Sequence, residues 1–228
     1  MRLVDTPSPT HNERRGTPVD MLVLHYTGML SAGAALQRLC DPAVEVSAHY
    51  TVVEDGTVHA HVPEDRRAWQ AGPSHWRGRD DVNSRSVGIE IVNTGHEWGL
   101  APFPPAQVAA VIAVGRGILA RHGIAPAMVV AHSDIAPLRK EDPGELFAWP
   151  QLARAGVGLW PDPAAPAEPL EDAGAALEEI GYGVAAYGLV PCVRAFQRRF
   201  RPARIDGVVD GGTARRISQL LRLVRCSP

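Results

Sequence analysis

Residues 131–149 read AHSDIAPLRKEDPGELFAW, and the organisation of the whole chain is clearest from this stretch. Pro137 and Pro143 each lack a backbone N–H and fix φ, so the stretch predicts a stiff loop and not a regular helix. The residues that lead into it, Ala127–Ala131, are small and apolar, as in a buried strand. A buried strand followed by a rigid loop with ionisable groups often carries catalytic residues.

Three ionisable side chains of the loop are candidates for chemistry: His132, Lys140 and Asp142. Lys140 is the only lysine of the chain, and all other cationic side chains are arginines. An ammonium is a compact point charge that a planar guanidinium does not replace. The lone lysine therefore indicates either a site that needs an ammonium or a single surface lysine in an arginine-rich chain. Composition alone does not separate these two interpretations.

Upstream of the loop, hydrophobic patterning predicts strands and helices around one sheet. Pro105 and Gly123 bound an amphipathic pattern typical of a helix. The Asp-Gly pair at 55–56 predicts a hairpin between two short strands. We expect strands at 20–26, 46–53, 58–62, 86–92 and 127–131, and helices at 31–39 and 105–122. The expected fold class is α/β, with a mixed central β-sheet flanked by helices.

The composition changes after Trp160, where PDPAAPAEP has the character of a linker. Three amphipathic helical patterns follow and predict a small three-helix domain. The first residues are polar and contain three prolines, which favours an extended arm. The expected organisation is an N-terminal arm at 1–18, a main domain at 19–160, a linker at 161–168 and a C-terminal helical domain at 169–228.

Charge and hydropathy exclude several classes of function. A net charge of -2 over 228 residues gives no basic surface for nucleic acid. No apolar run approaches the roughly 20 residues of a transmembrane helix. The N-terminus shows no apolar signal-peptide core, so a cytoplasmic protein is expected, with the periplasm or cell envelope as the alternative. The three scattered cysteines argue against a disulfide framework and a thiolate zinc site.

The apolar run 20–26 ends in His25 and Tyr26, and His25 adds a second imidazole to the candidate groups. Two imidazoles and a carboxylate, here His25, His132 and Asp142, could hold Zn²⁺ with a fourth position open. Zinc in such a site acidifies water and polarises a carbonyl, which makes amide hydrolysis accessible at neutral pH. The two histidines are far apart in sequence, however, and each taken singly fits a core or surface position better than a ligand position.

Glu90 lies in the middle of the apolar segment SVGIEIV, where an unpaired carboxylate is costly. One interpretation is an exposed sheet face on which Glu90 pairs with an arginine such as Arg85. The other is a carboxylate that points into a cleft and acts as general base. In the second case Lys140 would stabilise the oxyanion that forms.

The motifs LVLHYTG, VSAHYTV, RAWQAG, SVGIEIVN and HSDIAPLRKEDPGELFAWPQLA closely resemble zinc-dependent N-acetylmuramoyl-L-alanine amidases of the type-2 family. This family includes relatives of T7-lysozyme-like amidases and of peptidoglycan recognition proteins. The resemblance covers roughly residues 18–160. It implies His25, His132 and Asp142 as zinc ligands, Glu90 as the catalytic carboxylate, and Lys140 as the group on the oxyanion side. The family's motif usually has glycine where this chain has Leu138.

The function implied by this resemblance is zinc-dependent hydrolysis of the amide bond between N-acetylmuramic acid, or its 1,6-anhydro form, and L-alanine of the stem peptide. It would serve peptidoglycan turnover or recycling. The alternative is a non-catalytic protein that recognises peptidoglycan or muropeptides, although such relatives would be expected to lack metal ligands. Further residues expected near the substrate are His49, Trp69, His75 and Asn93, and for His49 support of the zinc ligands is the alternative to substrate contact.

The C-terminal region carries a second resemblance. The segments LEEIGYGV, CVRAFQRRFRP and RIDGVVDGGTARRI resemble the three-helix peptidoglycan-binding domain that is often fused to such amidases. This implies peptidoglycan or its muropeptide fragments as the partner. A module that only packs against the main domain is the alternative, because amphipathic helices with Gly/Asp loops are common.

Overall fold

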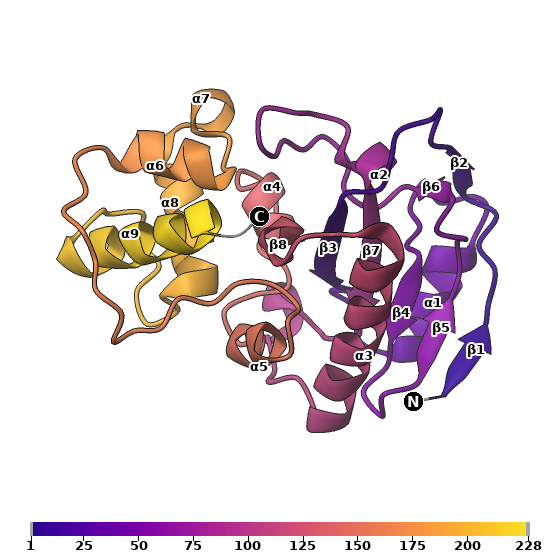
Figure 1. The fold of residues 1–228 in the computed structure, drawn as a ribbon. Coiled ribbons are helices and arrows are strands. Elements are labelled where there is room, and N and C mark those ends of the chain that lie inside the picture. Colours follow the sequence, from indigo (N-terminus) through magenta and orange to yellow (C-terminus); the bar gives the residue numbers. More distant parts are fainter. Residues whose placement is uncertain (1, 227–228) are drawn as a thin grey trace.

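A computed structural model describes residues 2–226, and Figure 1 shows their fold. Its main element is a six-stranded sheet in which β5 runs antiparallel to β4, whereas the four strands β4, β7, β3 and β8 are mutually parallel. The mixed α/β sheet expected from the sequence is thus confirmed. In spatial order the strands are Leu3–Asp5 (β1), Val58–Ala60 (β5), Tyr50–Val52 (β4), Ser86–Ile91 (β7), Met21–Tyr26 (β3) and Val129–Ala131 (β8).

The two main helices of this part begin and end at local sequence signals. Helix α3 (Pro105–His122) has proline at its first position, and Gly123 ends it in the left-handed region. Helix α1 (Ala32–Cys40) begins after Ser31, whose side chain accepts a hydrogen bond from the Ala34 N–H. The remaining elements are Val82–Arg85 (α2), Trp149–Arg154 (α5), the 3-10 turns His96–Trp98 (η1) and Pro126–Met128 (η2), and a small sheet of His11–Glu13 (β2) and Arg66–Ala68 (β6).

One turn of helix, α4 (His132–Ile135), interrupts the predicted loop after β8. It is closed by a 3.0 Å hydrogen bond from the Ala136 N–H to the His132 carbonyl. The helical turn ends at this position because Pro137 disfavours a helical backbone conformation at the residue before it. The loop expectation therefore holds for the residues that follow α4 and fails for the four residues within it.

Alternation along β3 decides which face of the sheet carries chemistry. Leu22 faces α3, since a Cβ built on Gly115 of that helix would lie 3.5 Å from the Leu22 side chain. Because successive side chains of a strand point to opposite faces, His25 points away from α3. Figure 1 shows α3 in front of the sheet and α1 behind it, so His25 lies on the side of α1.

The C-terminal region folds as the predicted three helices with one extra turn. These are Ala173–Ile180 (α6), Val184–Tyr187 (α7, the extra turn), Leu189–Phe200 (α8) and Gly211–Cys226 (α9). Their core continues into the main domain, where Trp76 packs edge-on against Tyr182 with ring centroids 5.1 Å apart. Within residues 2–226, no helix combines the length and apolar character that crossing a bilayer requires.

The segment 161–168 has no helix or strand, yet it is fixed to α9. Arg216 donates to the Pro161 carbonyl at 2.8 Å, and Gln219 donates to the Ala165 carbonyl at 2.7 Å. The predicted linker is therefore ordered by side chains of the last helix.

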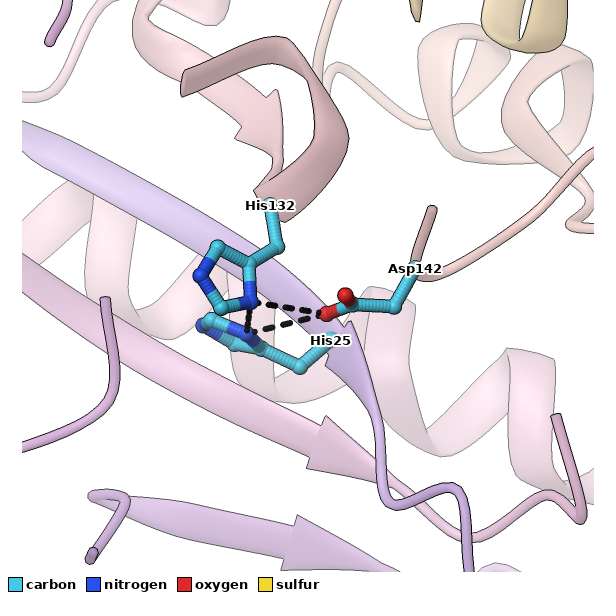
Figure 2. A group of neighbouring side chains, drawn as sticks. All are labelled: His25, His132 and Asp142. Carbon is cyan, nitrogen blue, oxygen red and sulfur yellow. Dashed lines mark hydrogen bonds and ion pairs between the residues drawn. The ribbon is translucent and has the colours of Figure 1, made fainter. Parts of the chain in front are cut away.

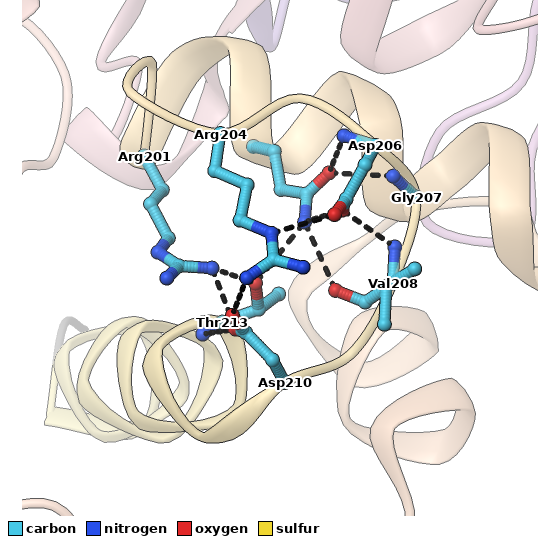
Figure 3. A network of polar contacts seen from close by, with 8 residues as sticks. Arg201, Arg204, Asp206, Gly207, Val208, Asp210 and Thr213 are labelled. Carbon is cyan, nitrogen blue, oxygen red and sulfur yellow. Dashed lines mark hydrogen bonds and ion pairs between the residues drawn. The ribbon is translucent and has the colours of Figure 1, made fainter.

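The loop between α8 and α9 is organised around the buried side chain of Gln197, and Figure 3 shows the residues that surround it. The Gln197 Oε1 accepts from the N–H groups of Asp206 and Gly207 at 3.0 and 2.8 Å. Its Nε2 donates to the Val208 carbonyl and to Thr213 Oγ1. One amide side chain thus satisfies backbone groups that a tight loop leaves without helical partners.

The N-terminal residues are extended, as expected, but they belong to the sheets and are not only a surface arm. β1 pairs with β5, and β2 pairs with β6. Arg14, which follows β2, is buried and donates to the carbonyls of Ser84 and Ser86, both at 2.8 Å. This guanidinium therefore anchors the N-terminal segment to the start of β7.

His49 lies beneath Arg14 and has no exposed surface. Its Nδ1 accepts from the Gly88 N–H at 3.0 Å, and its Nε2 lies 3.1 Å from the Arg66 carbonyl and 2.8 Å from Arg14. Burial, reinforced by the charge of Arg14, lowers the pKa of His49 from 6.5 to about 3. The folded protein therefore holds His49 neutral near pH 7.

This depressed pKa predicts acid sensitivity of the fold. Below pH 6.5 the unfolded chain takes up a proton at His49 that the folded chain refuses, so stability is lost as the pH falls. Between pH 6.5 and pH 5 this group should lower the free energy of unfolding by about 2 kcal/mol. Urea unfolding across this range should show a flatter pH dependence for His49→Gln than for the wild type. Equal slopes for both proteins would contradict the assignment.

Candidate metal and catalytic site

His25, His132 and Asp142 reach one point from three separate segments (Figure 2). β3 and β8 are parallel neighbours with Leu24 opposite Ala131, so the two histidines that follow these residues lie side by side. Their Nδ1 atoms are 2.8 Å apart. Asp142 Oδ2 lies 3.2 Å from the Nδ1 of His25 and 3.0 Å from that of His132. The structure thus brings together the three residues that were predicted as metal ligands.

The far nitrogen of each imidazole is held by an oxygen that only accepts. His25 Nε2 lies 2.9 Å from Gln70 Oε1, and His132 Nε2 lies 3.1 Å from the Ala71 carbonyl. Each Nε2 therefore carries a hydrogen, and in the neutral form of each ring the Nδ1 presents a lone pair. Two such lone pairs and a carboxylate oxygen within 3.2 Å repel one another unless a cation lies among them. This donor set fits zinc.

The protonation states of His132 and Asp142 suit metal ligation. Burial alone would lower the pKa of His25, but the interactions with Asp142 and Glu90 outweigh burial and raise it, so a metal ion would displace a proton from this ring. Burial lowers the pKa of His132 to about 4, so the ring is neutral near pH 7. Burial alone would raise the pKa of Asp142, but its interactions with His132 and His25 outweigh that effect and hold the pKa far below the usual range. A neutral imidazole and an ionised carboxylate are the forms that bind a metal.

Gln70 is a functional residue that sequence reasoning missed. Its Nε2 donates to Ser86 Oγ at 2.9 Å, which leaves its Oε1 for His25. The side chain lies over the β7 backbone at Gly88, where a Cβ would be only 1.2 Å from Gln70 Oε1. Gln70 and Gly88 occur in the motifs RAWQAG and SVGIEIVN, but nothing in the sequence shows that the two positions touch.

Glu90 lies opposite His25 in the paired strands β7 and β3, so both side chains point to the same face. Its Oε2 is buried and has no hydrogen-bond partner within residues 2–226. Burial raises the pKa of Glu90 to about 7, with the charge of Asp142 acting in the same direction and that of His25 opposing it. A carboxylate with a pKa near neutrality is suited to general acid–base catalysis.

Arg85, the alternative partner considered for Glu90, is engaged elsewhere. It forms a bidentate ion pair with Asp20, with N–O distances of 2.8 and 2.6 Å. The cation that acts on Glu90 from the loop is Lys140, whose charge lowers the pKa values of both Glu90 and His132. In the described part of the chain the Lys140 ammonium has no hydrogen bond or ion pair, so it is available to a substrate.

A model of the N-acetylmuramoyl-L-alanine amidase family matches residues 15–145, more than half of the chain. The chain belongs to this family. It is an amidase, as the sequence predicts, and its matched range contains every residue placed at the site so far.

Relatives and solved structures extend the likeness beyond the family model. The amidase AmiD of Escherichia coli (strain K12) is 39% identical over 223 residues, which cover 86% of this chain and 79% of AmiD. A structure of AmiD with anhydro-N-acetylmuramic acid-L-Ala-D-γ-Glu-L-Lys superposes with a TM-score of 0.79 at 35% identity, covering 94% of this chain and 98% of that one. The crystal structure of AmpDh3 from Pseudomonas aeruginosa superposes with a TM-score of 0.80 at 32% identity. The superposition covers 95% of this chain and 94% of AmpDh3. These matches therefore include most of the C-terminal helices.

Two of the four residues expected near the substrate are buried in this amidase. His49 is enclosed between Arg14 and Gly88 and has no exposed surface, which corrects the prediction of substrate contact and leaves support of the site through β7 as a prediction. Asn93 is also buried, and its amide donates to the Ala101 carbonyl and accepts from the Gly95 N–H. It shapes the loop after β7. In both cases the sequence did not show which polar groups the surrounding backbone would engage.

Trp69 and His75 remain at the surface, and both have partners. Trp69 donates its indole N–H to Asn12 at 3.2 Å. His75 lies 2.7 Å from Asp80 and contacts the ring of Tyr187 edge-on, so it lies at the junction with the C-terminal helices. No contact within residues 2–226 brings either ring to His25, His132 or Asp142.

The hydrogen bond from His25 to Gln70 predicts a loss of metal affinity when it is removed. Gln70→Met should weaken zinc binding by about 10- to 100-fold, because the acceptor that fixes the His25 ring and tautomer is lost. Titration against a chromogenic chelator measures this. Gln107→Met, which removes an equally buried glutamine on the opposite face of the sheet, should leave zinc affinity unchanged. A Gln70 variant with wild-type affinity would refute this support role.

Proposed function

We propose that this amidase is zinc-dependent and hydrolyses the amide bond between N-acetylmuramic acid, or its 1,6-anhydro form, and L-alanine of the stem peptide. The observation that carries the proposal is the convergence of His25, His132 and Asp142 beside Glu90. The names of the relatives AmiD and AmpD support the bond that is cleaved. Zinc held by these three residues would supply Lewis acidity at the scissile carbonyl.

Glu90 carries out the proton transfers of the reaction, and Lys140 and Asp142 stabilise its charges. Glu90 accepts a proton from the attacking water and returns it to the nitrogen of L-alanine as the carbon–nitrogen bond breaks. The products are a lactyl carboxylate on the sugar and a stem peptide with a free amine. Lys140 presents its ammonium to the carbonyl oxygen, where negative charge develops during attack. Asp142, which stays ionised, balances the positive charge of the site.

The first test is digestion of soluble anhydro-muropeptides and of intact sacculi by the full-length protein, with a chelator and with zinc added back. Release of free stem peptides should stop on chelation and return with zinc. Glu90→Gln should lower kcat by at least about 100-fold, and Lys140→Met by about 100-fold. The kcat of Lys140→Arg, which keeps the charge but not the shape of the side chain, should lie between that of Lys140→Met and that of the wild type.

The outcomes of this digestion separate the alternatives. Binding of sacculi without cleavage, indifferent to zinc, would favour the non-catalytic recognition protein. A preference for soluble anhydro-muropeptides would support the cytoplasmic location that we propose, and a preference for sacculi would support the cell envelope. Near-normal kcat in Glu90→Gln would remove that residue from the mechanism.

A small hollow beside Glu90 supports alanine as the first residue of the peptide. It has a volume of about 50 Å³ and is lined mainly by apolar side chains, among them Met29, Ala35, Leu39 and Val46. Because Glu90 also lines it, the hollow adjoins the group proposed to protonate the alanine nitrogen. We propose that it receives the alanine methyl group.

Filling this hollow should change substrate preference. Val46→Phe should lower kcat/KM about 10-fold for a substrate with L-alanine at the first position, and less for one with glycine, because a methyl group in a fitted pocket is worth about that factor. Val44→Phe, on the same loop but outside the hollow, is the matched control. An equal decrease for both substrates would show that the hollow does not select alanine.

We also propose that residues 169–228 bind peptidoglycan, as the resemblance of this region implies. A surface hollow of about 500 Å³ between the start of α6 and the end of α9 offers a binding surface; it is lined by charged side chains that include Glu171, Glu179 and Arg222. Sedimentation of the protein with sacculi, compared with a variant carrying Arg222→Glu, tests this assignment.

A further inference from the structure

The single turn α4 positions two of the three proposed metal ligands. His132 is its first residue. The N–H of Ser133, the next residue, donates to the backbone carbonyl of Asp142 at 3.0 Å and so ties the far end of the loop to the turn. Any shift of α4 relative to β3 would therefore move His132 and Asp142 together, away from His25.

A carboxylate within α4 is held by the C-terminal helices. Asp134 has no exposed surface, and its Oδ2 accepts from the Ala131 N–H at 2.9 Å and from Arg199 of α8 at 2.7 Å. Its Oδ1 accepts from the hydroxyl of Tyr182, between α6 and α7, at 2.7 Å. The residue two positions after a proposed ligand thus has two partners from a region about 50 to 65 residues further along the chain.

Arg199 holds the turn and the strand before it together. Its second terminal nitrogen donates to the Val129 carbonyl of β8 at 3.0 Å, and its guanidinium stacks over the Trp149 ring at 3.8 Å. The charge is almost fully buried, so it requires the Asp134 carboxylate as a partner. A planar guanidinium that satisfies a carboxylate, a carbonyl and an aromatic face at once permits little freedom of position.

Two further contacts extend this support along the loop. The Tyr187 hydroxyl of α7 donates to the Ile135 carbonyl at 3.2 Å, and Arg198 of α8 pairs with Glu141 at 2.6 Å. Arg198–Glu141 is partly exposed and contributes less than the buried pair. Figure 1 shows α4 at the border between the sheet and the C-terminal helices, and α4 contacts α8 directly.

We infer that the C-terminal helical region is a structural part of the metal site, and that Arg199 and Tyr182 are positioning residues for His132 and Asp142. This inference rests on the proposed zinc site. It gives the region a role that is independent of any binding of peptidoglycan. A contact that served only to dock the helices would stabilise the fold without altering how the ligands meet.

The test compares full-length Arg199→Met with Arg216→Met. Arg216 is also an arginine of the C-terminal region that donates to backbone carbonyls and lies over an aromatic ring, but its partners are Pro161, Phe200 and Trp160, not α4. For each protein, zinc affinity is measured by chelator competition, thermal stability by calorimetry without metal, and kcat and KM on a soluble muropeptide.

Arg199→Met should weaken zinc binding by about 10-fold or more and lower kcat with little change in KM, as removal of groups that orient metal ligands does. Arg216→Met should change only thermal stability. Arg199→Lys should recover part of the affinity. If Arg199→Met fails to fold, Tyr182→Phe, which removes one hydroxyl, should weaken zinc binding by about 2- to 10-fold.

Wild-type zinc affinity and kcat in a folded Arg199→Met protein would overturn the inference and leave the proposed function intact. The same would follow from equal losses in Arg199→Met and Arg216→Met, since that pattern tracks stability alone. Absence of zinc binding by the wild type would instead overturn the proposed function.

Discussion

The rest of the structure depends on one contact that requires a cation, either a proton on His25 or a metal ion: three electron-rich atoms meet in a buried place. The Nδ1 atoms of His25 and His132 approach to 2.8 Å, with an ionised Asp142 beside them. Side chains left free would turn away from such an arrangement. The parallel pairing of β3 with β8 places both imidazoles at one edge of the sheet, and acceptors behind each ring prevent rotation. The protein thus builds rigidity where local electrostatics oppose the geometry.

Residues from several distant parts of the chain hold these side chains in place. Gln70, from the long loop before β7, holds one ring, and the turn α4 carries the other. Asp134 then connects α4 to the last sixty residues through a buried ion pair. Trp76 and Tyr182 join the cores of the two parts. A division into a catalytic domain and a separate helical domain describes the sequence well, but the packing is continuous across it.

Much of the fold could be predicted because its signals are local. Proline and glycine bound α3, Ser31 caps α1, and the Asp-Gly pair marks the β4–β5 hairpin. The resemblance of the motifs supplied His25, His132 and Asp142, which pattern alone left open. Gln70, Arg14 and the Asp134–Arg199 pair could not be predicted, since each acts through residues more than forty positions away or through backbone groups that only the fold brings near. His49 was misplaced for the same reason, because its partners are backbone atoms and a guanidinium that sequence does not connect to it.

The crossing of Gln70 over Gly88 has a consequence for how this protein can evolve. A β-carbon at position 88 would occupy the place of the glutamine amide, so any other amino acid there would displace the Gln70 side chain from its present pose. Conversely, a shorter residue at position 70 would release the strand from its need for glycine and leave the imidazole of His25 without its acceptor. The residues at positions 70 and 88 therefore depend on each other. We expect glutamine at position 70 and glycine at position 88 to be kept or lost together.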